Sequence, residues 1–178
     1  EAKGNSFVFM GKDVRTLNYG SSIEDLSEIM VEDSSALSIV NNAGQVFHIR
    51  GGSLVKVYEG LLELKNGNVW GTSEVDAPYI ISTPNSIAKY TDGEFIASFD
   101  NITGKSQLLV LIGKMKFSNA LDPNLNTLVQ AGQFSLVDQN YENGLPRNPT
   151  KVGLKSFKET KKLFSAFKVL DKTKIEKM

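Results

Sequence analysis

The stretch from Tyr79 to Val137 constrains the fold of this chain more than any other. Short apolar or alternating runs are cut there at regular intervals by Gly, Asn and Asp. Few runs exceed about seven residues, a length typical of strands in sandwiches, barrels and β-solenoids. Such spacing indicates a ladder of short antiparallel strands rather than an enzyme scaffold built around one active-site loop. The sequence therefore predicts an all-β domain.

Two of these runs indicate which side chains enter the core. Phe95, Ala97 and Phe99 alternate with polar or smaller residues and should share one face of a strand. Residues 108–112 are apolar throughout, which predicts burial on both faces. The rhythm of strand and turn recurs about every twenty residues, within the range of solenoid coils. We therefore expect an antiparallel β-helix or β-solenoid-like domain of short strands.

Turn chemistry predicts three hairpins upstream of this stretch. The first covers residues 6–18 around Gly11-Lys12-Asp13, and the second turns at residues 41–44. The third turns at Lys65-Asn66-Gly67, with strands at 61–64 and 68–72 on either side, because Asn-Gly is the strongest short hairpin signal.

The composition changes after Asp138. Residues 140–150 have two prolines and a glycine and are expected to form a loop. From Ser156 to Leu170 five apolar residues fall at helical spacing, and Ser156 with Glu159 matches a capping box. We therefore divide the chain into a β domain (1–138), a linker loop (139–154) and a basic amphipathic helix with its tail (155–178).

Composition limits the chemistry that this chain can perform. Its formal net charge is zero over 178 residues, so no nucleic-acid partner is expected. It has no Cys and one histidine, His48, so we expect no metal, no cofactor and no catalytic residues. No apolar run is long enough to span a bilayer. Because the chain begins at Glu1 without a Met, we expect a processed or trimmed product.

Single residues leave an enzymatic alternative open. His48 is expected to face solvent or to be hydrogen-bonded at the edge of the core. A carbohydrate-active enzyme would need a pair of carboxylates, whose proximity a sequence does not show. The candidates are expected to be solvated surface charges and are Glu59, Glu63, Asp92 and Glu94.

Aromatic and basic residues are the candidates for partner binding. Trp70, Tyr58, Tyr79 and Tyr90 could anchor a partner, and the alternative is that they face the core. The helix carries Lys158, Lys161 and Lys162, which could contact an anionic membrane surface or an acidic partner. Its alternative role is to cap an open end of the β structure.

Several consecutive pieces resemble the FecR family of bacterial cell-envelope signalling proteins. They are residues 36–57, LLELKNGNVW (61–70), YIISTPNSIA (79–88), Gly93-Glu94-Phe95, LLVLIGKMKF (108–117) and VQAGQF (129–134). Their order and spacing carry the resemblance, which covers roughly residues 33–138. The positions that match its motifs are Gly67, Thr83, Pro84, Gly93, Gly113 and Gly132.

The resemblance implies an antiparallel β-helical domain on the outer side of the bacterial inner membrane. Members of the family transmit the occupancy of an outer-membrane transporter to a cytoplasmic sigma factor. The chain shows neither an anti-sigma segment nor a transmembrane helix, so the envelope-binding role carries over better than sigma-factor control. We therefore expect a non-enzymatic, exported module in the periplasm or cell envelope, whose partner is an envelope protein or a peptidoglycan-type glycan.

Two other functions remain open from the sequence. One is a structural β-solenoid scaffold that assembles with copies of itself into a homo-oligomer. The other is a carbohydrate-binding or carbohydrate-active envelope protein.

Overall fold

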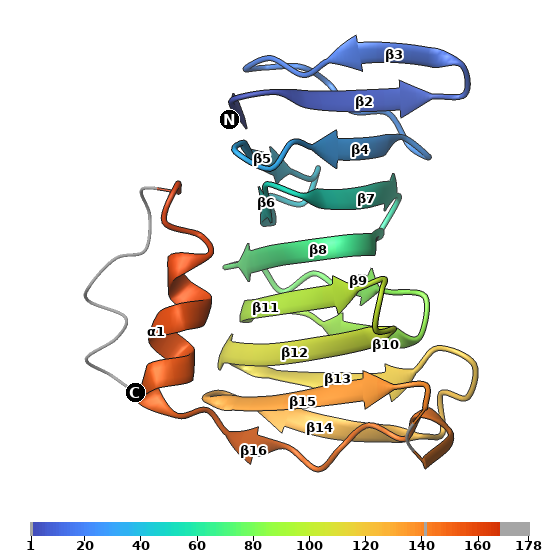
Figure 1. Ribbon diagram of the computed structural model, residues 1–178, viewed down its shortest axis with the longest axis vertical. Coiled ribbons are helices and arrows are strands. Elements are labelled where there is room, and N and C mark those ends of the chain that lie inside the picture. The colour runs from blue at the N-terminus through green and yellow to red at the C-terminus, as the bar shows by residue number, and fades with distance from the viewer. Residues whose placement is uncertain (1, 141, 168–178) are drawn as a thin grey trace.

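The structure, a computed structural model, describes residues 2–140 and 142–167 and is mostly β with one short α-helix (Figure 1). The prediction of a mostly β chain is confirmed. The strands form an open mixed sheet that folds into two layers, in which every strand pair is antiparallel except β8 with β9. The first layer contains β1 (Ala2–Lys3), β5 (Ala36–Val40), β6 (Val46–Arg50), β11 (Gly93–Asp100), β12 (Lys105–Ile112), β15 (Gln133–Asp138) and β16 (Thr150–Lys151).

The second layer runs alongside the first. It contains β2 (Ser6–Met10), β3 (Asp13–Thr16), β4 (Glu28–Val31), β7 (Ser53–Tyr58), β9 (Tyr79–Ser82), β10 (Ser86–Tyr90), β13 (Lys114–Asn119) and β14 (Asn126–Gln130). Apart from β2, β3 and β4, which follow one another in the second layer, the chain passes between the layers after every one or two strands. The hairpins predicted at residues 6–18 and 41–44 are confirmed as β2–β3 and β5–β6.

The long strand β8 (Leu61–Ser73) belongs to both layers. Its first half pairs with β7 and β9 in the second layer, and its second half pairs with β6 and β11 in the first. The change of layer falls at Gly67, whose φ is +96° and whose added Cβ would lie 2.3 Å from Ser53 Oγ. The hairpin predicted at Lys65-Asn66-Gly67 is therefore wrong. The Asn-Gly pair bends one strand because both of its halves find partners in different layers.

The main core lies between the two layers. Phe47, Phe95 and Leu108 from the first layer meet Leu62 and Ile81 from the second, and all five are almost fully buried. Phe95, Ala97 and Phe99 belong to this core, as their alternation predicts. Leu109 and Leu111 are buried on the other face of β12, so the predicted burial on both faces is confirmed for residues 108–111. It is wrong for Ile112, which is 44% exposed at the end of the strand.

The helix α1 (Leu154–Lys162) covers part of the outer face of the first layer (Figure 1). Phe164, just after the helix, is fully buried against Trp70, Ile96 and Leu109. The predicted capping box is wrong, because the helix begins earlier, with Gly153 at its N-cap and no side-chain cap. Ser156 lies inside the helix, and the helix ends at Lys162 rather than at Leu170, which is outside the described residues.

A buried polar network stabilises the Thr83-Pro84-Asn85 turn. Thr83 Oγ1 lies 2.6 Å from Ser106 Oγ and 2.8 Å from Ser86 Oγ, and it accepts the backbone N–H of Ser86. The side chain of Asn85 donates to the carbonyl of Gly104 at 2.6 Å. The turn between β9 and β10 is thus joined to the turn between β11 and β12. Thr83 and Asn85 are buried and Pro84 is exposed, so the two buried motif residues contribute to the fold through this network.

Candidate functional site: an open cleft between the layers

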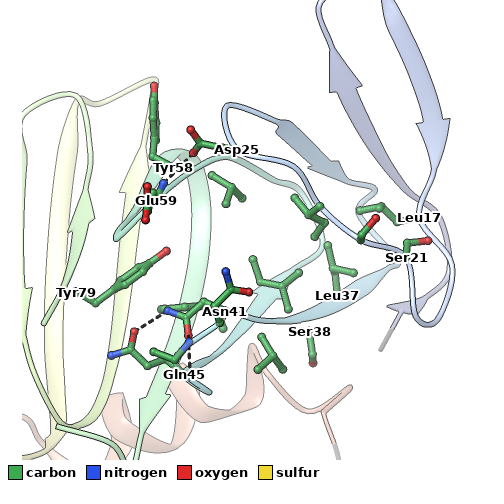
Figure 2. Close-up of a pocket in the computed structure, with 18 of the residues that line it drawn as sticks. Leu17, Ser21, Asp25, Leu37, Ser38, Asn41, Gln45, Tyr58, Glu59 and Tyr79 are labelled. Atoms are coloured by element: carbon green, nitrogen blue, oxygen red, sulfur yellow. Dashed lines mark hydrogen bonds between the residues drawn. The ribbon is translucent and has the colours of Figure 1, made fainter. Parts of the chain in front are cut away.

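A cleft of about 820 Å³ opens between the two layers near the N-terminal end of the stack (Figure 2). Its walls come from three segments that are far apart in the sequence. They are the β3–β4 connection (residues 17–25), β5 with its following turn (37–45), and the β7–β8 turn with Pro78 and Tyr79 (57–60 and 78–79). A volume of this size is typical of binding sites.

Local hydrogen bonds hold the β3–β4 connection over the cleft. Asn18 N donates to Ser21 Oγ at 3.0 Å, and Ser21 N donates back to the Asn18 carbonyl at 3.1 Å. At the other end of the connection, Leu26 N donates to the Val57 carbonyl, and Val57 N donates to the Ser27 carbonyl. The polar segment 18–25 is therefore a wall of the cleft, and hydrogen bonds hold both of its ends.

The floor of the cleft contains a fully buried amide, Gln45. Its Nε2 donates to the Ala77 carbonyl at 2.9 Å, and its Oε1 accepts from Asn41 Nδ2 at 2.7 Å. Asn41 Oδ1 in turn accepts the backbone N–H groups of Ala43 and Gln45. Because these buried polar groups are paired, the β5–β6 turn is set rigidly beneath the cleft.

Tyr79 projects its hydroxyl into the cleft (Figure 2). The residue is 5% exposed, and its ring packs 4.8 Å from that of Phe47. Within the described part of the chain, no hydrogen bond is seen for this hydroxyl. Burial raises the pKa of Tyr79 to about 12, so the phenol is neutral at physiological pH. A neutral hydroxyl donor therefore faces the cleft with its hydrogen-bonding capacity available.

The charged residues lining the cleft are both acidic. Asp25 and Glu59 lie on its rim, and Asp25 Oδ1 accepts the backbone N–H of Glu59 at 2.8 Å. This bond sets the two carboxyl-bearing residues side by side, as Figure 2 shows. No Lys, Arg or His is among the described lining residues. Lys56 and Arg15 lie nearby but outside the lining: Lys56 sits over the ring of Tyr58 at 5.1 Å, and Arg15 donates to the Ser22 carbonyl.

Of the four aromatic residues considered as anchors, Tyr58 and Tyr79 line the cleft. The hydroxyl of Tyr58 donates to Glu63 Oε2 at 3.2 Å. Tyr90 is 4% exposed and packs in the core against Phe95, with ring centroids 4.8 Å apart. Burial raises the pKa of the Tyr90 phenol above its usual range. For Tyr90, the alternative of a core-facing aromatic describes the structure.

Trp70 is also turned inward, beneath the segment that follows α1. It is 3% exposed, its Nε1 donates to Glu94 Oε1 at 2.9 Å, and Phe164 packs against it edge-on. His48 stacks on Trp70 at 4.7 Å and on Phe167 at 4.8 Å. Its Nδ1 lies 2.7 Å from Ser38 Oγ, so His48 is hydrogen-bonded at the edge of this cluster, one of its two expected placements.

The lysines of α1 face away from the core. Lys158 and Lys162 are exposed and Lys161 is half-buried, while the apolar side of the helix and of the following turn packs on the first layer. The arrangement agrees with a helix that covers part of the β structure and presents its charges to solvent. Any contact of this helix with a membrane would therefore use its lysines rather than its buried apolar face.

Three of the four carboxylates that were considered for glycoside chemistry accept hydrogen bonds from neighbouring side chains. Glu94 binds Trp70, Glu63 accepts from Tyr58, and Asp92 accepts from the hydroxyl of Thr91. Only Glu59 lines the cleft. Within residues 2–140 and 142–167, no group of three or more metal-ligating side chains occurs, and no helix there has the length and apolarity to cross a membrane.

Sequence reasoning missed the cleft because its walls are separate in the chain. The sequence placed Asp25 in a loop, Asn41 in a turn and Gln45 at the start of a strand, with no sign that the three lie together. One signal was present: the polar connection at residues 18–25 is long for a link between short strands, and such loops are often functional.

Comparison with known proteins gives a shared fold. No family model matches the chain, and no curated protein does. Two crystal structures of a putative anti-sigma factor from Parabacteroides distasonis, at 2.50 and 1.65 Å resolution, superpose on it with a TM-score of 0.61. Each is 16% identical and covers 74% of this chain, which spans 62% of the length of that protein. The comparison therefore shows a common architecture for most of the β domain.

Proposed function

We propose that this chain is a non-enzymatic regulatory module of FecR-like type that binds a protein of the bacterial cell envelope through the cleft. The fold shared with a putative anti-sigma factor supports the regulatory role. The passage of the chain between two layers supports the antiparallel β-solenoid that the family resemblance implies. Periplasmic or envelope location belongs to the same proposal and rests on that resemblance.

The observation that carries the proposal is the cleft itself. It is large, it is walled by backbone that hydrogen bonds hold in place, and a buried tyrosine hydroxyl points into it. A preformed cavity with a few fixed polar groups is the usual form of a recognition site. In its lining we find carboxylates, amides and hydroxyls that fit binding, without a histidine or lysine placed as a base.

Blocking the cleft tests the regulatory proposal. Ala43 is exposed on the β5–β6 turn and lines the cleft, so Ala43→Trp should fill it without disturbing the core. The matched control is Ile102→Trp, because Ile102 is 91% exposed on the β11–β12 turn. Transcript profiling of the producing bacterium should show a defined set of genes altered by the first variant and not by the second. Identical profiles for both variants and the parent would refute the regulatory role.

Cell fractionation tests the proposed location. The protein should be recovered with the periplasmic or envelope fraction and should be accessible to protease when the outer membrane is permeabilised. Recovery in the cytoplasmic fraction alone would overturn the envelope part of the proposal and leave the fold assignment intact.

A glycan is the second candidate occupant of the cleft. The lining is rich in the amide and hydroxyl side chains that hydrogen bond to sugars, including Asn18, Ser21, Ser22, Asn41 and Asn42. Tyr58 adds an aromatic ring at the rim. The two occupants differ in charge, and the experiment described below separates them.

A further inference from the structure

We infer that the cleft receives an extended segment of a partner protein that carries a lysine or arginine, with the cation held between Asp25 and Glu59 and a backbone carbonyl accepting from Tyr79. This inference rests on the proposed function and names the chemistry of its partner. Three features of the described residues support it: the charge of the rim, the Tyr79 hydroxyl and the apolar floor.

The rim favours a cation. Asp25 and Glu59 are exposed, and their order in space is set because Asp25 Oδ1 accepts the Glu59 N–H. That bond uses one carboxylate oxygen of Asp25 and none of Glu59, so oxygen acceptors remain for a guanidinium or an ammonium group. No basic residue is among the described lining residues, and the two cations nearby, Lys56 and Arg15, lie over the ring of Tyr58 and against the Ser22 carbonyl. An acidic ligand would be repelled, which disfavours a peptidoglycan-type strand with its own carboxylates.

Tyr79 favours a partner with accessible backbone. Tyr79 is only 5% exposed, yet its hydroxyl points into the cleft and makes no hydrogen bond within the described residues. Because this hydroxyl faces the open cleft, a hydrogen bond from it to a carbonyl of the ligand contributes the net value of about 0.5–1.5 kcal/mol. The carbonyls of a helix are already used by the helix itself, whereas those of an extended segment are available.

The floor supplies the apolar contact. Leu37 and Phe47 are buried at the base of the cleft, and Ile39 and Val57 are partly buried beside them. Side chains of an extended segment alternate in direction, so an apolar residue next to the cation would point toward this floor while the cation reaches the rim. The expected sequence signature is therefore a basic residue flanked by β-branched or other apolar residues.

Model peptides test the inference with the full chain. The probe is a fluorescein-labelled heptapeptide in which lysines alternate with valines. Two comparison ligands are used: the same peptide with glutamates in place of the lysines, and a labelled tetramer of N-acetylglucosamine. Fluorescence anisotropy gives the affinity, and amide chemical shifts of the ¹⁵N-labelled protein give the site. The lysine peptide should bind, shift amides of the cleft, and weaken as salt rises.

Matched variants identify the contacts. Asp25→Asn with Glu59→Gln should weaken the lysine peptide about tenfold, since rim charges act through exposed pairs. Asn keeps the oxygen that accepts the Glu59 N–H. The control is Asp122→Asn, because Asp122 is exposed and accepts one backbone N–H, from Asn124 at 3.0 Å, far from the cleft. Tyr79→Phe should weaken binding about threefold to tenfold. Its control, Tyr90→Phe, removes the hydroxyl of a residue that is buried to the same extent but lies outside the cleft lining, and it should leave binding unchanged.

Each contrary result overturns the inference in its own way. Equal affinity for the lysine and glutamate peptides would refute the cation site. The same conclusion would follow if the double variant Asp25→Asn with Glu59→Gln bound the lysine peptide as the parent does. Shifts in the cleft with the glycan and not with the peptide would replace the protein segment by a sugar. The proposed function fails separately: if Ala43→Trp alters no transcript while the lysine peptide binds as expected, the cleft recognises a cationic segment without a regulatory role. If that variant alters transcripts but the peptide does not bind, the regulatory role stands and the cation site falls.

Discussion

Two aromatic surfaces of this molecule look alike in sequence and differ in what covers them. On the outer face of the first layer, Trp70 lies under Phe164 of this same chain. In the cleft, Tyr79 is buried by its neighbours, but its hydroxyl faces open space. The first surface stabilises the fold, because its apolar contacts are made within the chain. The second surface has polar groups that are accessible to a ligand, so the cleft is the better candidate for a recognition site.

The largest expected effect belongs to the covered surface. Phe164 is fully buried, so Phe164→Ala should lower the free energy of unfolding by about 3 kcal/mol, as measured by urea denaturation. Trp70 is the single tryptophan, so its fluorescence should shift to the red in this variant. Phe164→Leu, the control, should cost less, and cleft binding should survive in both. If stability were unchanged, the covered surface would not be a structural contact.

The floor of the cleft should give the next largest effect. Gln45→Ala would leave the Ala77 carbonyl and the Asn41 amide without their partner, at a cost of about 2 kcal/mol. Gln107, an exposed residue of β12, is the matched control, and Gln107→Ala should change stability by less than about 0.5 kcal/mol. Equal denaturation midpoints for the two variants would mean that the cleft floor is not held by this amide.

The free energy of unfolding should fall at alkaline pH because of Tyr79 at the cleft. Burial raises the pKa of Tyr79 to about 12, whereas an unfolded tyrosine titrates near about 10. Above pH 10 the folded state holds this proton more tightly than the unfolded state does. The stabilisation is therefore complete below that pH and is lost as the pH rises toward 12. Urea denaturation over this range should show the loss, and Tyr79→Phe should reduce it. A pH profile identical to that of the parent would contradict the burial of this phenol.

The smallest effect is expected at the rim of the cleft. Asp25→Asn and Glu59→Gln change exposed groups, so each should alter the free energy of unfolding by less than about 0.5 kcal/mol. Thermal denaturation of the parent and both variants gives the comparison. A loss of several kcal/mol would show that these carboxylates hold the fold, and the contrast between a covered and an open surface would then disappear.

The sequence predicted those parts of the fold that depend on local pattern. Residues 94–100 and 108–112 alternate or are uniformly apolar, and both became the expected strands. Gly67 shows the limit, because Asn-Gly serves a hairpin or a bend according to which strands lie beside it, and those strands are distant in sequence. The helix start shows the same limit: Ser156 has capping chemistry, but the helix begins at Leu154, soon after β16 has paired with β15 in the first layer.

The candidate site was less predictable than the fold. Tyr58 and Tyr79 were identified as candidates, but they meet Asp25 and Gln45 only after residues 17–25, 37–45, 57–60 and 78–79 come together. Aromatic character alone selected Trp70 and Tyr90, which the fold buries. Burial depends on the packing of α1 and of the two layers, and no local pattern encodes that packing.

Photo-crosslinking from two positions in living cells tests the central claim most directly. One crosslinking residue replaces Asn42 at the cleft, and the other replaces Lys158 on the exposed side of α1. We expect the Asn42 position to yield an adduct with an envelope protein, identified by mass spectrometry, that Ala43→Trp abolishes, and the Lys158 position to yield none. An adduct from Lys158 without one from Asn42 would contradict the account, because recognition would then belong to the helix rather than to the open cleft.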